Sequence, residues 1–295
     1  MRIATQGEPV RVARTNAHEG PVYVPGEHAL YFTTLPEPGG ERPLVDIKRL
    51  DLATGNVSVA RADANVANGM ARAADGRLVV CEQHPAAISL VDPATGRSEA
   101  LVDSWRGLRL NSPNDVVVKR DGTVWFTDPS YGYLQGFRPE PQVGDFVYRY
   151  EPASGRLRVV ADSFDKPNGL AFSSDESSLY VTDSGANQEP GSYYVDRPHH
   201  IVAFDVRDGR HLGPGRLFAV TTPGFPDGLK VDSEGRVYAS AFSGVQIFDP
   251  SGHLIREIEL PGAVNFTFGG PDRDVLYVTT DDAVWAVQLD ARGAL

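Results

Sequence analysis

The stretch that indicates the fold is Asn168-Gly-Leu-Ala-Phe-Ser-Ser-Asp-Glu-Ser-Ser-Leu-Tyr-Val-Thr182. It begins with an amide residue, continues as a short apolar run, turns at acidic and serine residues, and ends as a second β-rich run. Similar openings recur roughly 40 to 60 residues apart, the period of propellers and other repeat arrays. The six openings are Glu19-Gly-Pro-Val-Tyr23, Asn68-Gly-Met-Ala71, Asn114-Asp-Val-Val117, Asn168-Gly-Leu-Ala171, Asp227-Gly-Leu-Lys230 and Asn265-Phe-Thr-Phe268.

Each opening is followed by a turn and a second strand, such as Gly122-Thr-Val-Trp-Phe-Thr127. Acidic residue–glycine pairs in these turns are typical of hairpins. Third and fourth strands follow, joined by turns such as Asp92-Pro-Ala-Thr-Gly96. Four strands per unit and six units predict an all-β, six-bladed β-propeller that occupies residues 1–295 as one domain. The last unit lacks an outer strand, and we expect Glu8–Ala13 to supply it and close the ring.

Composition narrows the function classes. The 295 residues are 41% hydrophobic and 23% charged, as in a globular protein with a large core. A formal net charge of −11 disfavours a nucleic-acid or anionic-membrane partner. Cys81 is the one cysteine, which excludes an internal disulfide and predicts a buried small side chain. The N-terminal residues carry no apolar segment of a secretory signal, and no run is long enough to span a bilayer, so we expect a cytoplasmic protein.

The six opening residues point to a metal site. The first strands of propeller blades line the central channel, so equivalent side chains converge on one axis. The series Glu, Asn, Asn, Asn, Asp, Asn offers only oxygen ligands, which suit a hard divalent cation. A simpler interpretation remains open for each residue, because Asn-Gly and Asp-Gly are also common turn dipeptides.

The chain resembles the SMP-30/gluconolactonase/luciferin-regenerating-enzyme family, in its gluconolactonase branch. The run from Arg106 to Gly132, with Asn111-Ser-Pro-Asn114 and Phe126-Thr-Asp-Pro-Ser-Tyr131 inside it, is similar to that family's signature. Further similar blocks are Lys166-Pro-Asn-Gly-Leu-Ala-Phe-Ser173 and Phe225-Pro-Asp-Gly-Leu-Lys-Val-Asp232. The resemblance implies a six-bladed propeller with a divalent cation, most simply Ca²⁺, with Mg²⁺, Mn²⁺ and Zn²⁺ as alternatives. It implies that the metal ligands are Glu19, Asn114, Asn168 and Asp227.

The same resemblance implies hydrolysis of a lactone, either a sugar lactone such as gluconolactone or a related cyclic ester. We expect Asp227 to be the catalytic base, with Asp115 as the weaker candidate. Whether a rim histidine assists proton transfer stays open, because His199-His200 is most simply a solvated pair in a loop. Expected substrate-binding residues are Asn114, Tyr131, Trp105 and Arg109; the candidate rim histidines are His84, His199 and His200.

The chain departs from the family pattern where substrate would be recognised. It reads Cys81-Glu-Gln-His-Pro-Ala86 after blade two, and Ser112 stands where animal members have an arginine. Three alternatives stay open: an organophosphate or aryl-ester hydrolase on the same metal centre, a non-catalytic ligand-binding propeller with a structural calcium, and a synthase related to strictosidine synthase. The sequence specifies no oligomeric state.

Overall fold

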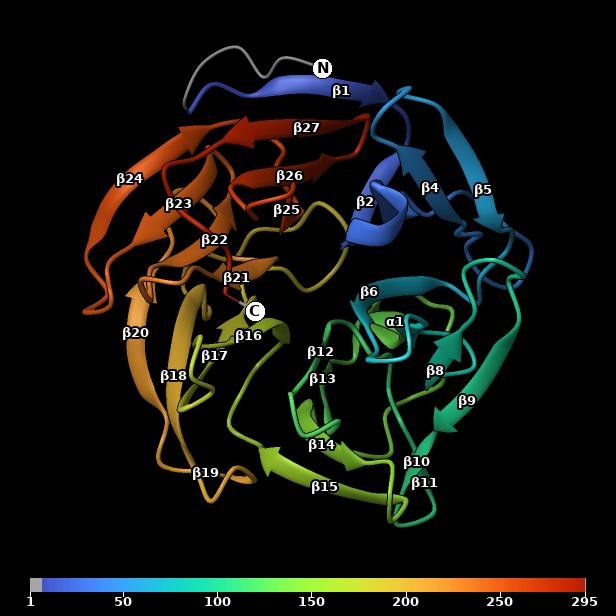
Figure 1. Cartoon of the computed structure of the whole chain (residues 1–295). Coiled ribbons are helices and arrows are strands. Elements are labelled where there is room, and N and C mark those ends of the chain that lie inside the picture. The colour runs from blue at the N-terminus through green and yellow to red at the C-terminus, as the bar shows by residue number, and fades with distance from the viewer. Residues whose placement is uncertain (1–6, 295) are drawn as a thin grey trace.

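The computed structural model describes residues 7–294 and is built almost entirely of antiparallel strands (Figure 1). Six small sheets surround a central hub, and in each sheet the strands succeed one another from the hub to the rim. The six-bladed β-propeller predicted from the sequence is confirmed. Residues 1–6 lie outside the described residues. They belong to the N-terminal segment from which we expect no secretory signal.

The first three blades have the strand order expected from the repeats. Blade one contains β2 (Ala17–Val24), β3 (Ala29–Thr34), β4 (Ile47–Asp51) and β5 (Val57–Arg61). Blade two contains β6 (Ala67–Arg72), β7 (Leu78–Glu82), β8 (Ala87–Val91) and β9 (Ser98–Val102). Blade three contains β12 (Val116–Val118), β13 (Val124–Asp128), β14 (Phe146–Glu151) and β15 (Arg156–Ala161).

The last three blades follow the same plan. Blade four contains β16 (Pro167–Phe172), β17 (Ser178–Asp183), β18 (His200–Arg207), the short β19 (His211–Leu212) and β20 (Arg216–Val220). Blade five contains β21 (Leu229–Val231), β22 (Val237–Ala241), β23 (Gly244–Phe248) and β24 (Leu254–Glu259). Blade six contains β25 (Asn265–Gly269), β26 (Val275–Thr280), β27 (Ala283–Gln288) and β1 (Val10–Arg14). Outside the blades lie a 3₁₀ turn (Pro25–Glu27), the hairpin β10 (Ser104–Trp105) and β11 (Leu108–Arg109), and α1 (Tyr131–Leu134).

The N-terminal strand closes the ring, as the sequence predicts. β1 pairs antiparallel with β27, from Val10 opposite Ala286 to Arg14 opposite Ala283 (Figure 1). The outer edge of blade six is therefore paired by a strand from the other end of the chain, which removes an edge that would otherwise be open to pairing.

Threonine hydroxyls join neighbouring blades at the hub. Thr33 Oγ1 donates to the carbonyl of Asn68, Thr127 Oγ1 to that of Asn168, and Thr182 Oγ1 to that of Asp227. Thr279 Oγ1 does the same with His18, across the closure of the ring. Each donor is the penultimate residue of its blade's second strand. Three of them bond the opening residue of the next blade, and Thr279 bonds the residue just before Glu19. A neutral hydrogen bond of this kind contributes about 1 kcal/mol.

Glycines after the opening residues allow the first strands to approach closely, so the turn interpretation of these dipeptides is wrong for blades two and four. Asn68-Gly69 lies within β6 and Asn168-Gly169 within β16. A Cβ atom at Gly69 would lie 2.5 Å from the Asn114 carbonyl oxygen, and one at Gly169 would lie 2.3 Å from that of Asp227. Glycine is required by the width of the hub and not by a turn.

Side chains between adjacent blades form the core. One cluster packs blade one on blade two around Tyr31, and another packs blade two on blade three around Phe126 and Tyr148. Cys81 is fully buried in the second of these clusters, as predicted. Of the helices in residues 7–294, none is long and apolar enough to cross a membrane.

Candidate active site at the hub

Five of the six opening residues, four of them the predicted metal ligands, meet at one small cavity in the hub. Glu19 lies in β2 and Asn168 in β16, whereas Asn114 and Asp227 lie just before β12 and β21. All four line a cavity of about 100 Å³, together with Asn68 of blade two. The cavity therefore gathers side chains from blades one to five.

Burial differs within this set. Glu19, Asn114 and Asn168 are no more than 5% exposed, whereas Asp227 is only half-buried. Asp227 also lines a much larger cavity of about 890 Å³, which we call the vestibule. His18, Tyr131, Gln135 and Asn187 line both spaces as well. The vestibule is therefore the approach to the hub, and Asp227 stands where the two spaces meet.

The two carboxylates of the hub favour a bound proton or cation. Burial raises the pKa of Glu19, and the nearby Asp227 charge raises it further. Burial also raises the pKa of Asp227, followed by the charge of Asp115, while hydrogen bonds from Glu19 and Asn168 oppose the shift. Two carboxyl groups that share a buried site cannot both ionise cheaply without a counter-charge. A divalent cation supplies that counter-charge.

Unpartnered amide oxygens in the hub also favour a bound cation. In the described part of the chain, Oδ1 of Asn68 and Oδ1 of Asn114 are buried and have no hydrogen-bond partner. An unpaired buried acceptor costs about 1–3 kcal/mol, so a ligand at this place would be stabilising. Within residues 7–294, no group of three or more His, Cys, Asp and Glu side chains could hold a metal. A cation in the hub would therefore need amide oxygens as well as the Glu19 and Asp227 carboxylates, and a hard ion such as Ca²⁺ accepts both.

Asp115 turns away from this cavity. Its Oδ1 accepts a hydrogen bond from the Val116 amide at 2.9 Å, and its Oδ2 is buried without a partner. The side chain lines neither the hub cavity nor the vestibule. Burial raises its pKa, and Lys230 partly opposes the shift. Its charge reaches the hub, but its carboxyl group does not border the space where a substrate would bind.

Two insertions bring further side chains to the cavities. The segment 129–144 between β13 and β14 contains α1, and Tyr131 of α1 is 5% exposed. Burial raises the Tyr131 pKa well above its ordinary value, and the Asp227 charge adds to this, so its hydroxyl remains a proton donor. The segment 184–199 between β17 and β18 contributes Asn187.

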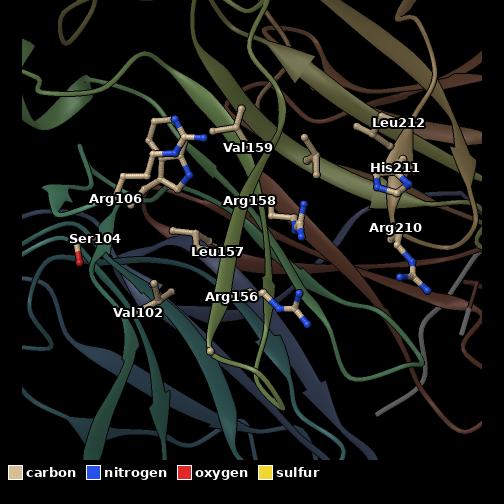
Figure 2. A pocket seen from close by; sticks show the side chains of 13 residues that line it. Val102, Ser104, Arg106, Arg156, Leu157, Arg158, Val159, Arg210, His211 and Leu212 are labelled. Carbon is tan, nitrogen blue, oxygen red and sulfur yellow. The ribbon is translucent and has the colours of Figure 1, made fainter.

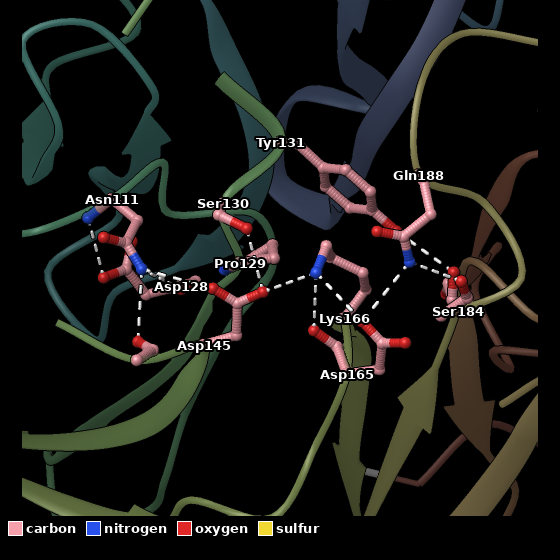
Figure 3. Close-up of polar contacts among 12 residues, drawn as sticks. Asn111, Asp128, Pro129, Ser130, Tyr131, Asp145, Asp165, Lys166, Ser184 and Gln188 are labelled. Carbon is pink, nitrogen blue, oxygen red and sulfur yellow. Dashed lines mark hydrogen bonds and ion pairs between the residues drawn. The ribbon is translucent and has the colours of Figure 1, made fainter. Parts of the chain in front are cut away.

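A buried lysine ties the two insertions together (Figure 3). Lys166 Nζ forms ion pairs with Asp145 Oδ2 at 2.8 Å and with Asp165 Oδ1 at 3.0 Å. Asp145 accepts from Ser130 Oγ, and Asp165 accepts from Gln188 Nε2. Ser130 and Gln188 immediately neighbour the cavity residues Tyr131 and Asn187. The network thus fixes the walls of the site from behind.

The family-signature block has a structural role here. Ser112 Oγ accepts from the Gly132 amide and donates to the Pro129 carbonyl, both at 2.8 Å. The backbone N–H of Asn111 donates to Asp128 Oδ2, and burial raises the pKa of Asp128 to about 8. These bonds hold the turn that presents Tyr131 (Figure 3).

Trp105 and Arg109 do not lie at the hub. Trp105 contacts Phe146 and Tyr148 in the core and lines a hollow of about 690 Å³ at the outer strands (Figure 2). The Arg106 guanidinium lies 4.6 Å from its ring centre. Arg109 borders a separate hollow with Arg138. The hairpin β10–β11 carries both residues outward, so the structure does not bring them to the other predicted site residues.

The histidine at the site was not among the rim candidates. His18 lines both cavities, and its Nδ1 lies 2.8 Å from Asp281 Oδ1. Burial lowers the His18 pKa, but the Asp281 hydrogen bond and the charges of Glu19 and Asp281 outweigh it and raise the pKa overall. Its place next to Glu19 in the sequence is the signal that would have found it. His84, His199 and His200 line neither cavity.

Comparison with known proteins agrees with this architecture. Residues 17–282 match the family model described as SMP-30/Gluconolactonase/LRE-like region. The lactonohydrolase oryL of Aspergillus oryzae is 29% identical over 94% of this chain and 69% of its own length. A gluconolactonase of Zymomonas mobilis is 34% identical over 64% of this chain, which spans about half, 52%, of that relative.

Solved structures also superpose on this chain over most of its length. The gluconolactonase XC5397 of Xanthomonas campestris superposes with a TM-score of 0.83 at 35% identity, covering 95% of this chain and 89% of that one. A calcium-binding regucalcin of Agrobacterium tumefaciens has a TM-score of 0.75 at 19% identity, covering 96% and 93%. The second likeness shows the fold alone.

Proposed function

Because the chain belongs to the SMP-30/gluconolactonase/LRE-like family, we propose that it is a lactonase that opens a cyclic ester to its hydroxy acid with the help of a divalent cation. Family relatives named lactonohydrolase and gluconolactonase support lactone hydrolysis. The observation that carries the proposal is the hub cavity, where two carboxylates with raised pKa values meet unpartnered amide oxygens at the end of an accessible vestibule. The predicted cytoplasmic location remains an expectation from the sequence.

The proposed ligands are Glu19, Asn114, Asn168 and Asp227. Their two negative charges would balance a divalent ion, and their all-oxygen chemistry favours Ca²⁺, with Mg²⁺, Mn²⁺ and Zn²⁺ to be compared directly. When bound, such a cation would act as a Lewis acid that polarises the lactone carbonyl and stabilises negative charge on its oxygen.

Asp227 is the proposed general base. It is half-buried and borders the vestibule, so it can contact a water molecule that approaches a bound lactone. A carboxylate at the junction of the two cavities is of the chemical type that serves as a general base. It would take the proton of the attacking water, and that proton would later reach the alkoxide released when the ring C–O bond breaks.

Tyr131 and Asn114 are proposed to position the substrate. The Tyr131 hydroxyl stays protonated and lies next to Asn168 and Ser184, so it can offer a hydrogen bond at the wall of the cavity. Asn114 lines the hub cavity, and its Oδ1 has no hydrogen-bond partner. Both groups are buried and held by their surroundings, which preserves the geometry between turnovers.

The test is acid release in a pH-stat from a panel of lactones, with each of the four cations added to chelator-treated protein. We expect hydrolysis that disappears on chelation and returns with one preferred ion, and a loss of at least about 100-fold in kcat for Asp227→Asn. Full activity of that variant would refute the role of Asp227. Chelation that lowers the melting temperature of a protein with no hydrolysis of any lactone would favour a structural ion.

A further inference from the structure

The vestibule has a built apolar wall that the hydrolysis of a sugar lactone does not require. Phe242 follows β22, Phe225 precedes Asp227 by two residues, and Tyr193 comes from the blade-four insertion. Phe242 contacts Phe225 with ring centres 5.3 Å apart and Tyr193 with ring centres 5.2 Å apart. We call these three residues the aromatic wall. It borders the same vestibule as Asp227, so a ligand at the proposed base also meets the wall.

The wall is exposed yet held in place. Phe242 and Tyr193 are 47% and 40% exposed, an unusual state for side chains of this size. The backbone amide of Phe242 bonds to the Pro223 carbonyl, and its ring lies directly over Gly224, where a Cβ atom would come within 2.5 Å of it. Ring contacts on two sides restrict the side chain further. A fixed, exposed aromatic surface loses little entropy when a ligand covers it, which favours binding.

The opposite side of the vestibule is also largely apolar. The connection between β3 and β4 contributes Leu35, Pro36, Pro38 and Pro43. The hub cavity, at about 100 Å³, has room for an ion and a few waters but not for a whole substrate. The vestibule, at about 890 Å³, falls within the range of pockets that bind drug-sized ligands. A single polyhydroxylated ring would leave most of this apolar surface uncovered.

The charges at the vestibule select against anionic ligands. Glu37, Glu189 and Asp281 line it together with Asp227, and His18 is paired with Asp281. Carboxylates of one sign around an opening repel a ligand that carries phosphate, sulfate or carboxylate. The occupant of the wall is therefore expected to be uncharged.

We propose that the aromatic wall binds an uncharged apolar substituent on the lactone ring, so that the substrate is an alkyl- or aryl-substituted lactone and not a bare sugar lactone. This rests on the proposed lactonase function for its chemistry. The ring carbonyl lies toward Asp227 and the hub, and the substituent lies against Phe242, Phe225 and Tyr193.

The test compares δ-valerolactone, δ-hexalactone, δ-octalactone and δ-decalactone with δ-gluconolactone. We expect kcat/KM to rise about twofold to fourfold for each methylene that the wall covers. Phe242→Ala should lower kcat/KM for δ-decalactone at least about tenfold through KM, and should leave δ-valerolactone within about twofold. Tyr193→Ala, on the insertion, provides a second variant if Phe242→Ala does not fold. Ile255→Ala is the matched control, because Ile255 is 53% exposed on the same blade and lies away from the vestibule.

Three results would overturn the proposal: no dependence on chain length, δ-gluconolactone as the preferred substrate, or an equal loss for δ-gluconolactone and δ-decalactone in Phe242→Ala. If no lactone is hydrolysed at all, the proposed function fails, but the wall is still tested by titration calorimetry with the uncharged δ-decalactone and δ-valerolactone, which the protein then leaves intact. Tighter binding of δ-decalactone that Phe242→Ala weakens would support the wall. Equal binding of the two lactones, or none, would overturn it.

Discussion

Asn265 and Glu19 join the two ends of the propeller at its centre: the Asn265 Nδ2 atom donates a 2.7 Å hydrogen bond to Glu19 Oε2. Both side chains are buried, and the Gly20 amide donates to the same carboxylate oxygen. Asn265 in turn accepts from the Phe266 amide, which fixes its orientation. Asn265 does not line the hub cavity, so its role is to hold Glu19 in position.

Replacing Asn265 with alanine is expected to weaken cation binding about 10- to 100-fold, the usual effect of removing a group that orients a ligand. Isothermal titration of chelator-treated protein with Ca²⁺ measures this directly. Asn56→Ala, in an exposed turn before β5, is the control. An unchanged Ca²⁺ affinity in a folded Asn265→Ala protein would contradict both the orienting role and the placement of the ion at Glu19.

The metal-free protein is expected to lose stability as pH rises. The folded-state pKa values of Glu19 and Asp227 are raised, so the folded state holds protons more tightly than the unfolded state does. The unfolding free energy therefore falls as pH rises from the range in which free carboxyl groups titrate to the raised pKa values of these two groups. Asp227→Asn removes one of these charges, and the metal-free variant should melt at least about 2 °C above the wild type at pH 8.

In the presence of a saturating cation, the wild type should instead melt above Asp227→Asn, because the variant lacks one ligand to the cation. Differential scanning calorimetry at pH 5 and pH 8, with and without Ca²⁺, separates the four cases. Asp205→Asn, on the exposed face of β18, is the control. A metal-free melting temperature that is the same for the wild type and Asp227→Asn at both pH values would show that the two carboxylates do not repel each other in the hub.

Much of the fold follows from local sequence because each blade is a repeat. The acidic hairpin turns and the second strands stand at regular offsets, so the blade count and the closing strand β1 could be predicted from the residues alone. The convergence of Glu19, Asn114, Asn168 and Asp227 on one cavity follows from the same symmetry. The structure adds the reason for the Asn-Gly pairs, which is the close approach of neighbouring first strands.

The residues outside the repeats could not be placed in this way. Trp105 and Arg109 precede blade three by only a few residues, yet the hairpin β10–β11 directs them to the outer strands. Tyr193 and Gln135 reach the cavities through insertions whose path depends on a lysine in another segment. Positions in a repeat follow from periodicity, whereas positions in an insertion follow from tertiary contacts that no local pattern encodes.

Gly169→Ala should be strongly destabilising. Its Cβ would meet the Asp227 carbonyl at 2.3 Å, and that carbonyl also accepts from the Gly169 amide and from Thr182. The first strands of blades four and five would have to separate, at a cost of about 1–3 kcal/mol for an overpacked site. Chemical denaturation measures the change. Gly26→Ala is the control, because a Cβ there meets no atom within 4 Å; equal effects of the two substitutions would contradict the close-approach argument.

Lys166→Met should damage catalysis and stability together, because Lys166 links the walls of the site. The substitution keeps most of the side chain's volume but leaves Asp145 and Asp165, which Lys166 neutralises at 2.8 and 3.0 Å, without their shared buried partner. Removing one partner of a buried ion pair costs about 3–5 kcal/mol of stability. Both aspartates are partly exposed and Asp165 also contacts Arg197, so we expect a cost of about 3 kcal/mol or less here.

Lys119→Met is the control, because Lys119 forms a similarly buried pair with Glu176 at 2.9 Å but lies away from both cavities. If the network holds Tyr131 and Asn187 in place, Lys166→Met raises KM for the lactone at least about fivefold at a temperature where the protein is folded, whereas Lys119→Met lowers stability and leaves KM unchanged. Equal effects of the two variants on KM would show that the lysine supports the fold without positioning the site.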